Sequence, residues 1–200
     1  MTSTCSTMLN RVKFKATRFC LRSFYLGKRI DFSEWCKDND VKFDDDFYQT
    51  YLKSKNIALI TKEKVKVGDL VVCITTERIP IKSTMVYKAL QGEVPYSEYW
   101  KMLDSTGDYT HHGLSDAYIG KLRDKLQVDP SFLREFPILI DPKYKILDGQ
   151  HRACSFMYIY GEDATVEAIC LYTLPEGGSS FQQLVSAIIK AMQRLGNIRK

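Results

Sequence analysis

The sequence predicts an α+β fold, in which a small mixed β-sheet is flanked by helices. Two observations lead to this prediction. Short apolar runs typical of buried strands alternate with segments of helical periodicity through the middle and end of the chain. The composition is that of an ordinary globular protein, with 44% hydrophobic and 26% charged residues among 200. We expect an α/β extension over 1–66, the domain itself over 67–175, and a linker with a C-terminal helix over 176–200.

The N-terminal extension carries its own helix and strand signals. Alternation of apolar and basic residues over 12–16 predicts a short strand. Asp31 followed three residues later by Glu34 is typical of a capped helix N-terminus. A second helix is predicted over 45–55, and an apolar strand over 57–60.

Sequence patterns in the first half of the domain predict one strand and two helices. A turn at Gly68 precedes a β-branched strand over 70–74. A helix over 83–90 ends at Gly92, and another follows over 95–103 with proline in its first turn.

Sequence patterns in the second half of the domain predict a β-hairpin between two helices. A helix over 115–126 with a serine cap precedes strands 137–140 and 144–147. A helix then runs from Gly149 to about Tyr160 and leads to a strand over 166–172. The amphipathic segment 181–195 packs on the sheet or pairs two subunits as a homodimer.

Composition and cysteine spacing exclude several classes of protein. The net charge of +5 is well short of a strongly basic nucleic-acid footprint. The six cysteines are widely spread without a Cys-x-x-Cys pair, which disfavours a zinc site or a disulfide scaffold. No apolar run approaches the roughly 18 residues that span a bilayer. We expect a cytoplasmic protein with no membrane partner, and the basic, acid-free first 30 residues leave a transit peptide as an alternative.

The turn Asp148-Gly149, between a predicted strand and a predicted helix, is the most informative segment. Unpaired amides and the dipole of a helix N-terminus favour an anion there, and His151 and Arg152 add donors. Asp148 then serves as a Mg²⁺ ligand or accepts a proton from a hydroxyl. The alternative is a purely structural turn, in which Asp148 caps the helix and Arg152 is a surface charge.

The run Ile146-Leu-Asp-Gly-Gln-His-Arg-Ala153 resembles the signature of the ParB/sulfiredoxin-like superfamily. In that superfamily a hydrophobic-Asp-Gly-x-His-Arg turn opens the nucleotide-binding helix. Sulfiredoxins need a cysteine where this chain has Gln150, and Cys154 is expected to be a buried core residue. Chromosome-partitioning ParB proteins carry Glu-Arg-Arg in the turn. The chain is therefore most similar to the Asp-Gly-x-His-Arg subgroup, which includes ATP- or ADP-dependent kinases of a free amino acid.

The resemblance implies a role for each residue of the turn and for several outside it. Asp148 is the expected catalytic base or Mg²⁺ ligand, and His151 and Arg152 are the expected donors that stabilise the transferring phosphoryl group. Glu77 lies at a place comparable to a catalytic glutamate of the family's kinases. The residues expected to bind the nucleotide, through backbone or side chain, are Gly149, Gln150, His151 and Arg152.

Two residues outside the turn are further candidates for nucleotide contact. His112 precedes Gly113, which lets a loop approach a ligand, although a histidine near a helix start more often serves as a cap. Ser83 can hydrogen-bond a nucleotide, although its more common use is as the N-cap of the following helix.

These residues predict a nucleotide-binding protein, an ATP-dependent phosphotransferase acting on a small hydroxylated metabolite such as an amino acid or a sugar, with Mg²⁺ as cofactor. One alternative is a ParB-like nucleotide- and DNA-binding or nuclease-like protein. For DNA, the basic and aromatic residues over 11–29 are the candidate surface, unless they are a solvated face paired with the acids over 31–46. The other alternative is a scaffold with a degenerate site.

Overall fold

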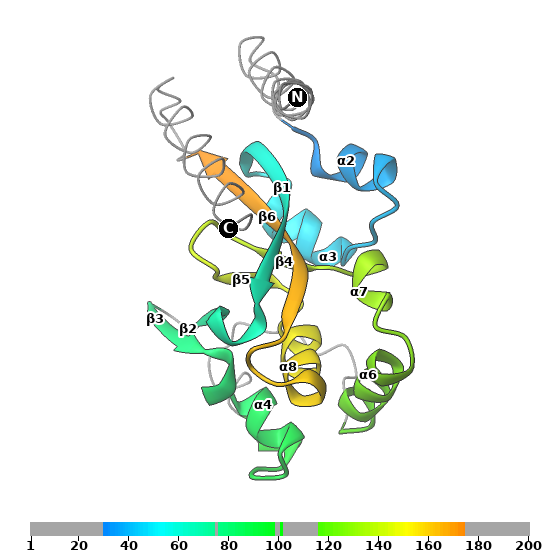
Figure 1. Ribbon diagram of the computed structural model, residues 1–200. Coiled ribbons are helices and arrows are strands. Elements are labelled where there is room, and N and C mark those ends of the chain that lie inside the picture. Colours follow the sequence, from blue (N-terminus) through cyan, green and yellow to red (C-terminus); the bar gives the residue numbers. More distant parts are fainter. Residues whose placement is uncertain (1–29, 75, 99–100, 102–115, 175–200) are drawn as a thin grey trace, which may run out of the picture. The chain divides into compact units, whose positions relative to one another are not determined.

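The computed structural model describes residues 30–74, 76–98, 101 and 116–174, and the side chains of 74 and 116–119 are not described (Figure 1). The elements, in chain order, are α2 (Phe32–Asp38), α3 (Asp45–Phe47), the π-helical turn η1 (Tyr48–Leu52), β1 (Asn56–Lys66), the 3-10 turn η2 (Val67–Asp69), β2 (Val71–Ile74), β3 (Glu77–Pro80), the 3-10 turn η3 (Ile81–Ser83), α4 (Met85–Leu90), α6 (Asp116–Val128), α7 (Phe132–Glu135), β4 (Ile138–Ile140), β5 (Ile146–Asp148), α8 (Gln150–Tyr160) and β6 (Thr165–Leu174). This is a mixed α+β fold.

The chain divides into two compact units. The described residues of the first are 30–39, 44–61 and 171–174, and those of the second are 40–43, 62–74, 76–98, 101 and 116–170. The first unit contains α2, whose N-cap Asp31 accepts a hydrogen bond from the Glu34 amide at 3.0 Å. The second unit contains the Asp148-Gly149 turn. The expected division at 66 and 175 stays a prediction.

The main sheet has four strands in the order β1-β6-β4-β5. β4 pairs antiparallel with β5 and parallel with β6, so the sheet is mixed as predicted. All three residues of β4 are buried, which agrees with a central strand covered on both faces. The parallel pair requires a crossover, and α8 lies within that connection.

A second, two-stranded sheet consists of β2 and β3, paired antiparallel with Val72 opposite Ile79. It lies beside the β4–β5 turn, because the Val71 amide donates to the Tyr144 carbonyl at 3.0 Å and the Arg78 guanidinium bonds the Lys143 carbonyl. The strand predicted over 70–74 thus exists, but it belongs to this hairpin.

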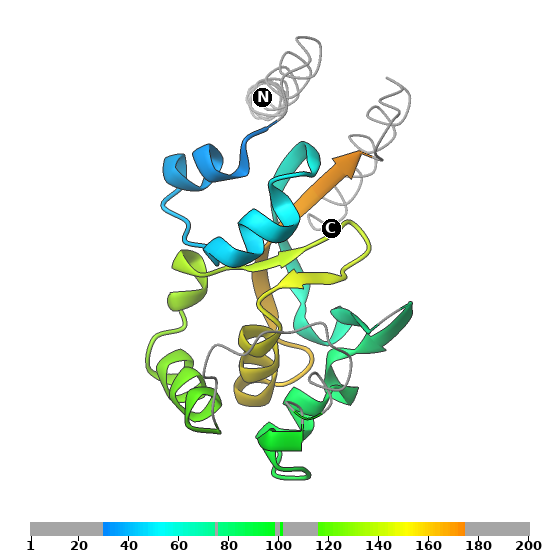
Figure 2. The ribbon, with the colours of Figure 1, turned by 180° about the vertical axis from the view of Figure 1, so that it is seen from behind.

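Helix α8 is the centre of the second unit and lies between α4 and α6 in both views (Figures 1 and 2). Its buried side chains include Ala153, Cys154 and Met157, which contribute to the core with Ala168 and Cys170 of β6. Because one helix contacts two others and strand β4, the turn that starts α8 is held on several sides.

Several predicted elements are confirmed, among them α2, α4, α6, the β4–β5 hairpin, α8 and β6. Others differ in extent. The short strand expected over 57–60 continues to Lys66, and the helix expected over 45–55 ends as a π-helical turn at Leu52. Thr84 caps α4 by accepting from the Tyr87 amide at 3.3 Å, so the prediction of Ser83 as N-cap is wrong. The expected strand over 12–16 and the helix over 181–195 lie outside the described residues.

Within the described part of the chain, no helix combines the length and apolar character needed to cross a membrane. Cys154 is fully buried, as predicted, and burial raises the pKa of its thiol to about 12, although the hydrogen bond between Cys154 and Thr84 opposes that shift. The thiol therefore stays protonated and packs as a small apolar group, so Cys154 is not a reactive thiolate.

Candidate functional site

The site begins where β5 ends and α8 starts. Gly149 is the N-cap of α8 and has φ +90°, a conformation that favours glycine. Gly149 is buried, and its carbonyl accepts the first intrahelical hydrogen bond, from the Ala153 amide at 2.9 Å. No side chain in the described part of the chain caps the helix start. The amides of 150–152 therefore precede the first hydrogen-bonded turn and lie at the positive end of the helix dipole.

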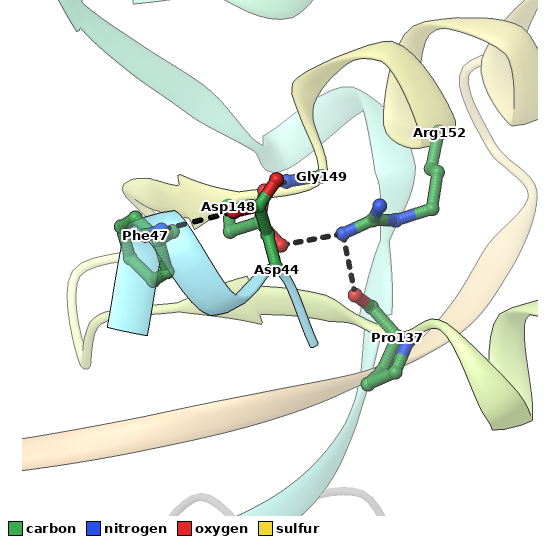
Figure 3. Close-up of polar contacts among 6 residues, drawn as sticks. All are labelled: Asp44, Phe47, Pro137, Asp148, Gly149 and Arg152. Atoms are coloured by element: carbon green, nitrogen blue, oxygen red, sulfur yellow. Dashed lines mark hydrogen bonds and ion pairs between the residues drawn. The ribbon is translucent and has the colours of Figure 1, made fainter. Parts of the chain in front are cut away.

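Asp148 and Arg152 form an ion pair across this turn (Figure 3). Arg152 Nη2 donates to Asp148 Oδ2 at 2.7 Å and to the Pro137 carbonyl at 3.2 Å. The second carboxylate oxygen, Oδ1, accepts the Gly149 amide at 2.7 Å. The side chains of Asp148 and Arg152 are 21% and 17% exposed, so the pair is largely shielded from water. The expectation of Arg152 as a surface charge is wrong.

The guanidinium lies directly over Gly149. A Cβ placed on Gly149 would come within 2.9 Å of Arg152 Nη2 and 3.1 Å of Nε. Arg152 Nε is buried and has no hydrogen-bond partner among the described residues. Buried donors are normally satisfied, so this nitrogen is a donor in need of an acceptor. The structure thus combines an uncapped helix start with an unsatisfied guanidinium nitrogen.

His151 contacts a residue that is distant in the sequence. Its Nε2 forms a hydrogen bond with the hydroxyl of Tyr96, and the two rings meet edge to face at 5.9 Å between centroids. Burial and, as the smaller cause, the positive charge of Arg152 together lower the pKa of His151 to about 4. His151 is therefore neutral near neutral pH, and any ligand contact it makes is a hydrogen bond without a charge.

The structure brings together Asp148, Gly149 and Arg152, with His151 on the same helix turn, but it places Ser83 and Glu77 elsewhere. Ser83 is exposed in η3 and lines a groove that includes none of residues 148–152. Glu77 is exposed on β3 and forms no side-chain ion pair with the described residues. His112 lies outside the described residues. The roles of these three stay predictions.

The residues at the turn can hold the expected groups only after one rearrangement. Among the described residues, no cluster of three or more His, Cys, Asp or Glu side chains could hold a metal ion. Mg²⁺ is commonly bound by one or two carboxylates together with phosphate oxygens and water. Asp148 fits that pattern once Arg152 releases its Oδ2. The phosphates fit the amides of 150–152 and the unsatisfied Arg152 Nε.

Two partners of the site were not anticipated from the sequence. Tyr96 is 4% exposed and lies 55 positions before His151, and Pro137 supplies its carbonyl from 15 positions before Arg152. The burial of Tyr96 is decided by the tertiary structure, and nothing in the sequence singles it out among the twelve tyrosines. The Pro137 contact has no signal in the sequence either, because every residue has a carbonyl.

Comparison of the chain with protein-family models, with curated proteins and with solved structures finds no match. Function is therefore argued from the site itself.

Proposed function

We propose that the chain is a ParB/sulfiredoxin-like nucleotide-binding protein that transfers a phosphoryl group from ATP to a small hydroxylated molecule. The observation that carries the proposal is the shielded Asp148–Arg152 pair over Gly149, at a helix start that no side chain caps. A purely structural turn would satisfy these donors internally. Here no described residue supplies an acceptor to Arg152 Nε.

The ion pair supports a partner exchange when phosphate arrives. Arg152 faces one carboxylate oxygen at 2.7 Å, and a multiply charged phosphate is a stronger acceptor that also uses Nε. The amides of 150–152 add their donors at the positive end of α8. Arg152 then stays in place while its acceptor changes from Asp148 to phosphate. Asp148 keeps its contact with the Gly149 amide and gains a free Oδ2.

The freed carboxylate supplies the remaining chemistry. Asp148 Oδ2 accepts the proton of the substrate hydroxyl as the hydroxyl oxygen attacks the terminal phosphorus of ATP. The bond from that phosphorus to the β-phosphate oxygen breaks and ADP leaves, while Arg152 neutralises the charge that develops on the phosphoryl oxygens. Neutral His151 orients the phosphates by hydrogen bonding without adding charge. Mg²⁺, when bound, would supply further neutralisation of the phosphate charge, and Asp148 would hold it as the alternative to its role as base. The pair thus keeps Asp148 occupied until the nucleotide is present.

The DNA-binding alternative depends on the basic residues over 11–29, which lie outside the described residues. Within the described part of the chain no observation favours it over the phosphotransferase.

The proposal is tested with Asp148→Asn, which removes the charge of the carboxylate and retains an acceptor for the Gly149 amide. Because the variant frees Arg152, ATP without Mg²⁺ should bind at least as tightly as to the wild type in calorimetry. Transfer of labelled phosphate to a mixture of hydroxylated amino acids and sugars should fall by about a hundredfold or more.

The matched control is Asp163→Asn, the same change at an exposed carboxylate paired with Lys66 at 2.9 Å. It should change neither ATP binding nor transfer. The proposal fails if the wild type does not bind ATP, or if Asp148→Asn transfers phosphate as well as the wild type does.

A further inference from the structure

A groove separate from the Asp148-Gly149 turn lies in the second unit, beside the C-terminal half of α8. Its volume is about 510 Å³, within the range of small-molecule sites. The lining side chains come from η3, α4, the turn after α4, α8 and the turn after α8. They are Lys82, Ser83, Tyr87, Lys88, Gln91, Glu93, Met157 and Glu162. We call this site the α4 groove.

Hydrogen bonds hold the walls of the α4 groove in place. Thr84 is 2% exposed, and its hydroxyl bonds the Ile81 carbonyl at 2.7 Å and lies 3.5 Å from Cys154 Sγ of α8. On the opposite wall, the Glu162 carbonyl accepts the Gly68 amide at 3.0 Å. Both walls are thus attached to buried or hydrogen-bonded backbone, so the hollow exists before any ligand binds.

The polar side chains of the α4 groove leave most of their hydrogen-bonding capacity unused. Lys82 Nζ and Glu162 Oε2 form an ion pair at 3.1 Å. The remaining polar side chains make no hydrogen bond or ion pair with another described residue; they are Ser83, Tyr87, Lys88, Gln91 and Glu93. A hydroxyl, a phenol, an ammonium, an amide and a carboxylate therefore converge on one hollow.

The charge balance and the apolar surface of the α4 groove indicate which class of ligand fits it. The α4 groove holds two lysines and two glutamates, so its formal charge is balanced and an anion such as a nucleotide gains little there. Met157, 1% exposed, and the half-buried Tyr87 give it an apolar side. A sugar matches both properties, because its hydroxyls bond charged and amide side chains while its C–H face packs against an aromatic ring.

We propose that the α4 groove binds an uncharged polyhydroxylated molecule, a mono- or disaccharide. The site is distinct from the phosphate site proposed above, because none of its lining residues belongs to 148–152. The inference therefore does not depend on ATP binding.

The test is an NMR titration of the whole chain with glucose, maltose, glycine betaine and ATP, followed through ligand saturation transfer and backbone shifts. Glucose or maltose should bind and shift the amides of α4 and of the turn after it. The double variant Ser83→Ala/Gln91→Ala alters two exposed side chains, so it should fold, and it should weaken sugar binding by about tenfold or more.

Two controls separate this site from the first. Asp148→Asn and Asp163→Asn should bind the sugar as the wild type does, whatever their effect on ATP. Sugar binding by both and not by the double variant supports the proposal. The proposal is overturned if neither sugar binds the wild type, if the double variant binds as tightly as the wild type, or if glycine betaine or ATP shifts the groove amides and the sugars do not.

Discussion

Each end of helix α8 has a glycine with a positive φ angle, but the surroundings of the two glycines differ. The helix starts at Gly149 with φ +90° and is capped at its other end by Gly161 with φ +85°. A Cβ on Gly161 would meet nothing within 4 Å, whereas one on Gly149 would meet the Arg152 guanidinium at 2.9 Å. Glycine at 161 is thus required by conformation alone. Glycine at 149 is also required by the side chain that lies over it.

The ion pairs near the two ends differ in the same way. At the start, Asp148 and Arg152 are 21% and 17% exposed, whereas Lys66 and Asp163 near the end are 58% and 88% exposed. Water screens the exposed pair, so its charges contribute little to stability. In the shielded pair, removal of either Asp148 or Arg152 leaves the other charge without its partner in a largely buried place, which is destabilising. The comparison predicts that changes at the start affect binding and stability, and that changes at the end affect stability at most.

The largest effect is expected for Gly149→Ala. The new Cβ strains a left-handed backbone and displaces the guanidinium from Asp148 and Pro137. The free energy of unfolding should fall by about 2–4 kcal/mol. Denaturant unfolding measures this loss, and calorimetry with ATP should show no binding by the folded variant. If Gly149→Ala binds ATP with the affinity of the wild type, the Arg152 guanidinium does not contribute to phosphate binding.

A smaller effect is expected for Gly161→Ala, the matched change at the other end of the helix. The backbone at φ +85° and ψ 166° is in a region that only glycine adopts readily, so the free energy of unfolding should fall by about 1–3 kcal/mol. ATP binding by the folded variant should equal that of the wild type. If both glycine variants lose ATP binding to the same extent, the contrast between the two ends is wrong.

The pH dependence of stability should report on His151. Its pKa is lowered from 6.5 to about 4 in the folded protein, so the unfolded chain takes up the proton first as the pH falls. The contribution of His151 to the free energy of unfolding should therefore be constant above pH 6.5. It should decrease by about 1–3 kcal/mol as the pH falls toward 4. Urea unfolding at a series of pH values checks this, and His151→Gln should flatten that part of the profile.

The smallest effect is expected for Asp163→Asn. The Lys66 hydrogen bond and charge lower the pKa of Asp163, but the carboxylate is exposed and screened by water. The melting temperature should match that of the wild type. A clear decrease would mean that the exposed pair is coupled to the helix end more strongly than its exposure indicates.

Much of the second unit could be predicted from local sequence signals. Apolar β-branched runs predicted β4 and β6, and the Asp-Gly step predicted the start of α8, because these signals act within a few neighbouring residues. In the first unit, the sequence predicts the Asp31 cap for the same reason. Local signals failed at β1, where a strand continues through the polar and charged residues up to Lys66 because β6 pairs with it.

The composition of the candidate site was determined by the sequence, and its geometry by the tertiary structure. The sequence placed Asp148, Gly149 and Arg152 within one helical turn, so their proximity follows from chain connectivity. It held no sign that Arg152 would also bond the Pro137 carbonyl, or that Tyr96 would meet His151. These contacts join residues far apart in the chain, and they form only because packing around α8 brings β4 and the segment after α4 to the same helix end.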